Sequence, residues 1–507
     1  MQSLSLYSMA EVESSPAPSG RGKFVDPHWT LCLPLLALTA IFFAAPENRL
    51  IAAMASSTVY TLMQWLVPQC RLRRDAVLSP QNLATLLFLA KLVVVPMLVM
   101  LVGPTVGVLP SLPTHDSIEW ALLIATVAYI AFCYGLSFVS ARALDPGSRP
   151  LLNALSQIPS RNTVLVFAAL GLTGFALIFG SPAGFMEYFL NPPEVKLNQS
   201  TEATWAEFLA IILRPFLAVA LVAMWSRHVD GAAGHHSHAK KVAVGILAAV
   251  VILAANLTFA FNRAAFVFPL ISMAAVYSAR VKRISPWTML LTAAMALPLL
   301  ISIGTYRAAT PRDTEVFTNS DALQASLAKA SDNFQVYSAA PQFTGYFYEK
   351  TGWGDHLLGG SSLIASALSP IPILGKSFRE TNGPAIFNRA IYGSLGFEDQ
   401  IIPYEAELFV NFHAAGVAAG FFGLGLLLGG MQRWLDYASS TFGAFAIQYA
   451  GIWGATLTVW SVSIYSQILF YFFGPFYVFI ALQWARKWLR SLNRQHTALR
   501  HAHGAGR

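Results

Sequence analysis

The sequence predicts an all-α polytopic membrane protein with about twelve transmembrane helices and one large extracytoplasmic loop between helices nine and ten. Of its 507 residues, 55% are hydrophobic and only 11% are charged, with a mean hydropathy of +0.53. Soluble domains carry about 25% charged residues. Long apolar runs recur from Trp29 to Leu482 and are continuous, which favours spanning helices over the alternating strands of a barrel. Arginine and lysine gather in alternate loops, as expected of a chain that crosses a membrane repeatedly.

The chain begins with a tail and continues in two membrane blocks. Residues 1–28 are rich in Ser, Pro and Gly, and we expect a disordered cytoplasmic tail, because the first apolar run starts too late for a signal peptide. Helices one to nine are predicted within 29–304, and helices ten to twelve within 408–482. The predicted ranges are 29–45, 50–67, 83–102, 119–141, 163–180, 205–225, 241–261, 264–280, 287–304, 408–430, 441–460 and 462–482.

Basic residues set the predicted orientation, since loops rich in Arg and Lys remain in the cytoplasm. One set of loops carries Arg71, Arg73, Arg74, Arg142, Arg149, Arg161, Arg227, Lys240, Lys241, Arg280, Lys282, Arg283 and Arg433. Among the alternate loops, 103–118 holds no basic residue and 181–204 holds only Lys196. Both termini are therefore expected in the cytoplasm, the basic C-terminal tail 483–507 included, and the loop 305–407 is expected outside.

Several function classes find no support in the sequence. The net charge of +8 comes from basic residues beside the helix ends, so we expect no nucleic-acid partner. The three cysteines, Cys32, Cys70 and Cys133, have no metal-ligand spacing and are expected to pack as small apolar residues. No nucleotide-binding, dinucleotide-binding or hydrolase motif is present, and we expect neither a cofactor nor a metal site.

The loop 305–407 is too long to be a simple connection, and loops of this size are usually functional. A helix capped by Ser320 or Asp321 is predicted through residues 322–339. The apolar segment 357–374 is too short and too rich in Pro and Gly to span the membrane. It is expected to be re-entrant or to lie at the membrane interface.

Basic side chains within or beside apolar segments are candidates for binding an anion. Arg214 lies inside an apolar run, where a charged side chain usually has an ion-pair partner or a functional role. Arg263 begins a helix on the outward side and is read either as a snorkelling side chain or as an anion clamp. Lys91 is similarly placed to Arg214, and an internal structural pair is expected there. Arg307, Arg379 and Arg389 add outward guanidinium groups that suit a phosphate or diphosphate; Arg312 lies near them.

The segment 403–430 combines a polar beginning with a glycine-rich apolar helix. Glu407 and Asn411 are four residues apart and share a helix face, with Tyr404 one turn earlier. Glu407 is a candidate general base, and it is alternatively an interfacial carboxylate paired with an arginine. His413 is a candidate base or phosphate donor, and it is alternatively a histidine at the headgroup level.

Four glycines follow at small-xxx-small spacing, namely Gly416, Gly420, Gly425 and Gly429. This spacing lets a neighbouring helix approach closely. We therefore expect these glycines to pack helices and to carry no chemistry.

Residues 361–430 resemble the bacterial oligosaccharide repeat-unit polymerases of the Wzy type, which make O-antigens and exopolysaccharides. That family has ten to fourteen spans and one large periplasmic loop. The elements that carry the resemblance are Ile371-Pro372, Lys376 and Arg379, Ala406-Glu407, Asn411-Phe412 and Gly416, with Asn262-Arg263 at the start of an earlier span. Two features depart from the pattern: His413 stands where the family often has glycine, and Ile373 rather than arginine follows Pro372.

The resemblance implies polymerisation of undecaprenyl-diphosphate-linked oligosaccharide at the outer face of the bacterial inner membrane, without a metal. For that activity the candidate catalytic residues are Glu407, Asn411 and His413, and no role for His413 comes from the resemblance. The candidates for binding the diphosphate and glycan are Arg214, Arg263, Arg307, Arg379, Arg389 and Tyr404. Glu405 is expected to project from a different face than Asn411. Membrane lipid and chain-length regulator and flippase proteins would be partners. The alternatives are a glycosyltransferase like an O-antigen ligase and, in a different class, a lipid-linked glycan flippase or transporter.

Overall fold

The computed structural model describes residues 24–73, 76–106, 109–141, 150–190, 205–231, 238–257, 264–285, 331–332, 334–371, 374–393 and 402–504. Within these residues the named elements are helices, and an isolated β-bridge joins Phe24 to Arg73. The longer helices before the loop are α1 (Cys32–Phe43), α2 (Ile51–Leu66), α3 (Pro80–Leu89), α4 (Val95–Val102), α5 (His115–Ala141), α6 (Pro150–Leu155), α7 (Arg161–Phe179), α8 (Pro182–Leu190), α9 (Trp205–Leu213), α10 (Pro215–Asp230), α11 (His238–Leu257) and α12 (Ala264–Arg280). The later ones are α15 (Pro341–Lys350), α16 (Ser361–Leu368), α17 (Gly383–Tyr392), α18 (Tyr404–Tyr437), α19 (Thr441–Ala455), α20 (Val462–Phe472) and α21 (Gly474–Gly504).

Several helices begin at capping residues that are visible in the sequence. The side chains of Ser79, Ser160, Ser440, Ser461 and Asn382 accept a hydrogen bond from a backbone N–H in the first turn of α3, α7, α19, α20 and α17. Such caps satisfy N–H groups that have no partner within the helix. Proline within the first two positions, as in α3, α10 and α15, fits because its missing N–H is not needed there.

Five helical stretches among the described residues are long and apolar enough to cross a membrane: Pro80–Val102, His115–Val139, Arg161–Phe179, Phe208–Asp230 and Tyr404–Tyr437. A sixth is possible if α20 and the first part of α21 count as one span, although they are bent by 53°. The class of an all-α membrane protein is thus confirmed. Helices occupy each predicted span range except 287–304, which lies outside the described residues, and the count of twelve stays a prediction.

The predicted span 462–482 is not one straight helix. α20 ends at Phe472 and α21 begins at Gly474, followed by Pro475. Proline has no N–H to donate and its ring clashes with the preceding turn, so the helix cannot continue straight through this point. A similar junction separates α9 from α10 at Arg214, which is followed by Pro215.

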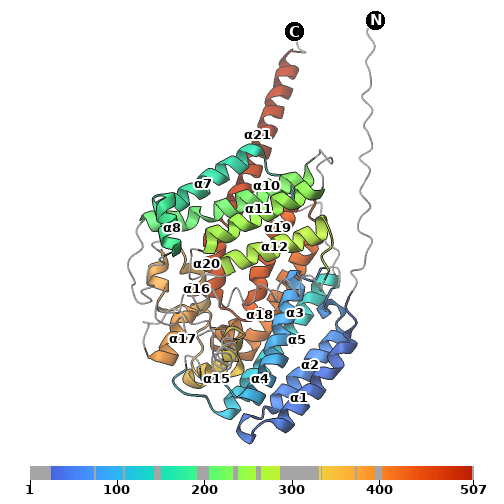
Figure 1. The fold of residues 1–507 in the computed structure, drawn as a ribbon, viewed down its shortest axis with the longest axis vertical. Coiled ribbons are helices and arrows are strands. Elements are labelled where there is room, and N and C mark those ends of the chain that lie inside the picture. The colour runs from blue at the N-terminus through green and yellow to red at the C-terminus, as the bar shows by residue number, and fades with distance from the viewer. Residues whose placement is uncertain are drawn as a thin grey trace.

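The helices pack around two buried apolar clusters. One draws on α1–α5 together with α15, α17 and α18, and the other on α6, α7, α10–α12 and α19–α21. Figure 1 shows α18, α19 and α20 in the centre, between α1–α5 on one side and α7–α12 on the other. The far end of α21 stands clear at the top of the view, while α15–α17 lie in the lower half. The helices α18 and α19 therefore form the junction of the two blocks, since α18 packs on α5 and α19, and α19 packs on α3, α10 and α12.

The described part of the loop, with α15–α17, is attached to the bundle by polar contacts. Glu349 at the end of α15 accepts hydrogen bonds from the backbone N–H of Thr114, at 2.7 Å, and from its hydroxyl. Gln335 accepts from the backbone N–H of Thr105 at 3.0 Å. The first contact fixes α15 at the beginning of α5, and the second joins the residues before α15 to those after α4. The predicted helix 322–339 lies mostly outside the described residues.

Candidate functional site

The helix α18 is broken eight residues after its start. Phe412 has φ −147° and ψ 17°, and His413 has φ 56° and ψ −160°. A positive φ with ψ near −160° is a conformation that glycine adopts and other residues rarely do. This is the position at which the resembled family often has glycine, so the chain here places a histidine in a glycine-like conformation.

The break folds the first part of α18, Tyr404–Asn411, back along the second part. Leu408 fills the space beside Gly416 and Gly420, and the ring of Tyr404 lies 5.4 Å from that of Phe421. In a straight helix, residues 16 or 17 positions apart would be separated by about 25 Å. The segment Tyr404–Asn411, called the half helix below, is thus a separate element, and the predicted continuous span 408–430 is wrong at its beginning.

A second segment of the chain stabilises this break. The backbone N–H groups of Leu358 and Gly359 donate to the carbonyls of Val410 and Asn411 at 3.1 and 3.3 Å, and that of Gly360 donates to Asn411 Oδ1 at 2.9 Å. Because the helix stops here, those carbonyls have no partner further along α18. Non-helical backbone inside a membrane protein is tolerated where protein groups satisfy it in this way.

Glu407 lies on the half helix with its side chain fully buried. Its Oε1 accepts a hydrogen bond from the Ser366 hydroxyl of α16 at 2.6 Å, and its Oε2 accepts from the backbone N–H of Val462, the first residue of α20, at 3.1 Å. A Cβ at Gly383, the first residue of α17, would lie 2.5 Å from Oε1. The carboxylate therefore sits where two helices begin, and the positive ends of helix dipoles favour a negative charge there.

Asn411 faces α16 as well, so the four-residue spacing correctly predicted a shared face. Its Nδ2 donates to Ser362 Oγ at 2.7 Å and to the Glu407 carbonyl at 2.6 Å. Its Oδ1 accepts a hydrogen bond from the Gly360 N–H. The side chain is fully buried. Its polar atoms are thus engaged in holding the half helix, α16 and the loop before α16 together.

Glu405, two residues before Glu407, turns to another side of the half helix, as predicted. It pairs with Lys91 of the π-helical turn Ala90–Val94, and Lys91 also donates to the carbonyl of Thr458 at 3.2 Å. The internal structural pair predicted for Lys91 is confirmed, and its partner is Glu405. Glu405, Glu407 and Asn411 are all at most 1% exposed, so the polar beginning of this segment is buried within the protein.

Tyr404 and His413 lie at the two ends of the half helix. Tyr404 is half-buried and packs on Phe421. His413 is exposed at the break, where its ring lies 5.3 Å from that of Phe409 and packs over Gly354. Tyr404 lies near enough to Glu407 to interact with it electrostatically. Among the described residues, no hydrogen bond joins Tyr404 or His413 to the Glu407 carboxylate.

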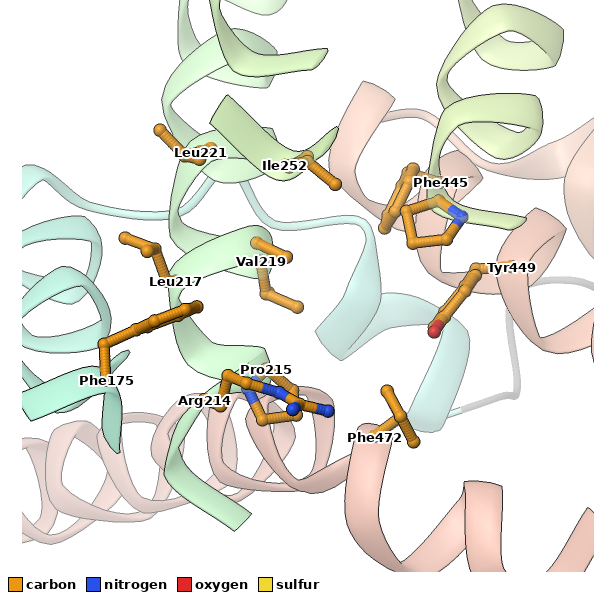
Figure 2. Close-up of a pocket in the computed structure, with 12 residues that line it drawn as sticks. Phe175, Arg214, Pro215, Leu217, Val219, Leu221, Ile252, Phe445, Tyr449 and Phe472 are labelled. Atoms are coloured by element: carbon orange, nitrogen blue, oxygen red, sulfur yellow. The ribbon is translucent and has the colours of Figure 1, made fainter. Parts of the chain in front are cut away.

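Arg214 is placed elsewhere, at the junction of α9 and α10. It is 8% exposed and lines a cavity of about 30 Å³ together with Phe175, Val219, Ile252, Phe445, Tyr449 and Phe472. Figure 2 shows its guanidinium extending toward the side of the cavity where Tyr449 and Phe472 lie. Phe472 ends α20, whereas Glu407 contacts Val462 at its beginning. The eleven residues of α20 thus separate the two sites by about 15 Å.

The remaining predicted arginines are partly described. Arg379 follows a short 3₁₀ helix and is exposed; it lies near enough to Tyr471 of α20 to act on it electrostatically. Arg389 of α17 is exposed and donates to the carbonyl of Glu380 at 3.1 Å. Arg263 and Arg307 lie outside the described residues. Arg214 and Arg379 therefore share the C-terminal end of α20, away from Glu407.

The sequence reasoning missed Ser366, Gly383 and Val462, which surround Glu407. A signal for Ser366 was available, because Ser362 and Ser366 are four residues apart in a mostly apolar helix and so share a face. No such signal marks Val462, whose contribution is its backbone N–H. Within the described residues, no three His, Cys, Asp or Glu side chains gather in a way that could hold a metal ion.

Comparison with known proteins adds no relative: no family model, curated protein or solved structure matches this chain.

Proposed function

We propose that this chain is a membrane glycosyltransferase that polymerises undecaprenyl-diphosphate-linked oligosaccharide repeat units at the outer face of the bacterial inner membrane. The observation that carries the proposal is the buried Glu407 carboxylate, held by Ser366 and by the first N–H of α20. The Ser366 hydroxyl donates to Glu407 in the way that an acceptor sugar hydroxyl would. If the acceptor hydroxyl took the place of the Ser366 hydroxyl, Glu407 would contact the group that must lose its proton and could act as its general base.

The proposed reaction forms one glycosidic bond and breaks one bond to phosphate. The terminal hydroxyl of the acceptor repeat unit attacks the anomeric carbon of the donor chain, and Glu407 takes the hydroxyl proton. The bond between that carbon and the donor diphosphate breaks, and undecaprenyl diphosphate leaves with the electron pair. No metal ion or nucleotide enters this scheme.

The separation of the sites along α20 suggests how the acceptor lies. Its own diphosphate is several sugars away from the hydroxyl that reacts. Arg214 and Arg379, about 15 Å from Glu407 along α20, suit that distant diphosphate better than the one that leaves. Arg389 belongs to α17, and the first residue of α17, Gly383, lies against the Glu407 carboxylate. Arg389 is proposed, together with Arg263 and Arg307, to bind the donor diphosphate that leaves.

The proposed topology follows from the alternation of basic loops, with both termini in the cytoplasm and 305–407 outside. It is supported by the placement of α15–α17 away from the projecting end of α21 (Figure 1). Thiol labelling tests it. A cysteine replacing the native Ser326 should react from outside, and one replacing Ser237 should not; the reverse pattern would reject the topology and the function with it.

The test of function is polymerisation of a purified lipid-linked repeat unit by matched amounts of purified variants in detergent. Glu407→Gln should lower turnover by about 10²–10⁴-fold with substrate affinity largely kept, as expected for loss of a general base. Glu47→Gln is the matched control, because Glu47 is exposed in the short helix Pro46–Asn48 and far from α18 in sequence. Wild-type turnover in Glu407→Gln across pH 6–9 would leave the carboxylate with a structural role only.

One observation favours a flippase or transporter as the second candidate. Transporters build their sites from interrupted helices near the membrane midplane, and ionisable residues inside a membrane commonly mark transport paths. The half helix and the buried Lys91–Glu405 pair have both properties. Liposomes distinguish the candidates: a flippase moves labelled lipid-linked repeat units across the bilayer without lengthening them, whereas a polymerase yields a ladder of longer glycans.

A further inference from the structure

The Lys91–Glu405 pair holds the half helix from the side that Glu407 does not use. Residues two apart on a helix project about 200° apart. Glu407 contacts α16, α17 and α20, while Glu405 contacts Lys91 in the stretch Pro80–Val102. Lys91 is 3% exposed and Glu405 is 1% exposed. The half helix is therefore attached to different parts of the bundle by two carboxylates.

A third group lies close to this pair. The ring of Tyr348 of α15 lies 4.5 Å from that of Phe409 of the half helix, tilted by 45°, and Tyr348 is fully buried. Burial, and secondly the charge of Glu405, raise the pKa of Tyr348 well above its ordinary value, so the hydroxyl keeps its proton. Within the described residues, neither this hydroxyl nor Glu405 Oε2 has a hydrogen-bond partner. A donor and an acceptor in one buried region are suited to be joined directly or through one water.

The half helix needs such attachments because it cannot hold its own position. Eight residues form about two turns, and helices shorter than about twelve residues are marginal without tertiary contacts. A buried ion pair adds little net stability over an apolar pair of the same shape, whereas removal of one partner leaves a buried charge and is strongly destabilising. The pair is thus better explained by the position that it imposes than by the stability that it adds.

We propose that Lys91 is a positioning residue for Glu407: by pairing with Glu405 it sets the place of the half helix between α16, α17 and α20. Only the activity measurement of this proposal rests on the function proposed above, whereas the cross-linking measurement does not. The structural content of the proposal is that the half helix keeps its place while the two side chains match, as an ion pair or as an apolar pair of similar shape. It shifts when one of them is neutralised alone and leaves the other charge buried.

The experiment compares Lys91→Met, Glu405→Gln and the double variant Lys91→Met/Glu405→Met. The position of the half helix is measured by oxidative cross-linking of cysteines that replace Leu408 and Gly420, which are in contact, after the native cysteines are replaced. Both single variants should lose cross-link yield, and the double variant should recover it. In the polymerisation assay the single variants should lose about a hundredfold in kcat with KM changed less than about threefold, since small displacements of a reacting group have effects of that size.

A fourth variant, Tyr348→Phe, removes only the hydroxyl that interacts electrostatically with Glu405. It should lower kcat by less than the single charge variants while the cross-link persists, because Lys91 still holds Glu405. If a single charge variant does not fold, the double variant decides, since it buries no unpaired charge.

Two results would overturn the proposal. The first is full cross-linking in Lys91→Met at wild-type kcat. The second is a double variant as inactive and as poorly cross-linked as the single ones. If the wild-type protein polymerises nothing, the proposed function fails, and cross-linking alone decides the positioning role: loss in the single variants with return in the double supports it, and unchanged yield rejects it.

Discussion

The two parts of α18 differ in what they contribute to the molecule. The half helix Tyr404–Asn411 carries two carboxylates and an amide, each buried and bonded to a different neighbour. The part from Ala414 to Tyr437 carries glycines and apolar side chains over most of its length. Its Gly425 lies against the Phe132 carbonyl of α5, with a Cβ there only 3.0 Å from the Cα of Gly135. One part is held by directional polar contacts, and the other by close approach of backbones.

The comparison teaches that the glycines of one helix serve two purposes. Gly425 and Gly429 receive α5, as the small-xxx-small spacing predicted, since the nearest atoms to a Cβ at either position belong to that helix. Gly416 and Gly420 instead receive Phe412, Leu408 and Tyr404 from the same helix folded back. The second pair therefore makes room for the half helix and, with it, for Glu407.

The largest effect is expected where backbones touch. Gly425→Val should prevent accumulation of folded protein, because the new Cβ would overlap the Phe132 carbonyl and force α5 and α18 apart. The measurement is the yield of monodisperse protein after detergent extraction. Gly423→Val is the matched control: it lies two residues away on the same helix, and nothing lies within 4 Å of a Cβ there. Equal yields of both variants would show that α18 does not depend on this approach.

A smaller effect is expected from the polar part. Asn411→Leu should lower the free energy of unfolding by about 2–4 kcal/mol, because the Gly360 N–H loses its buried acceptor and the apolar side chain cannot bond Ser362. Denaturant titration of the purified protein measures it. Ser362→Ala, which removes only one acceptor of Asn411, should cost about 1 kcal/mol. If the two variants lose equal stability, the contact with the loop at Gly360 contributes nothing.

The sequence predicts some of this arrangement for identifiable reasons. Apolar runs located the helices, the spacing of Glu407 and Asn411 gave their shared face, and the cost of a charge in an apolar run showed that Lys91 needs a partner. The fold-back could not be predicted, because helical periodicity is similar on both sides of residue 412. The N–H groups that stabilise the break come from Leu358–Gly360, about fifty residues earlier. The partners of Glu407 were missed because two of the three, Gly383 and Val462, act through backbone.

The smallest effect concerns the residue between the two parts. His413 has φ 56° and ψ −160°, a region open to glycine and strained for other residues by about 1–3 kcal/mol. His413→Gly removes that strain and also removes the packing of the imidazole on Phe409 and Gly354. His413→Ala removes the same packing and keeps the strain. The difference between the two variants therefore isolates the backbone term, and the glycine variant should be the more stable by about 1–2 kcal/mol.

Thermal unfolding of both purified variants in one detergent measures this difference, and their turnover separates conformation from chemistry. If the break needs only the left-handed conformation, His413→Gly keeps wild-type turnover in the proposed polymerisation and melts above His413→Ala. If the imidazole takes part in the reaction, both variants lose turnover alike, whatever their stability. An alanine variant as stable as the glycine variant would mean that the chain relaxes at 413. In that case the break is imposed by the hydrogen bonds from Leu358, Gly359 and Gly360 rather than stored in one strained residue.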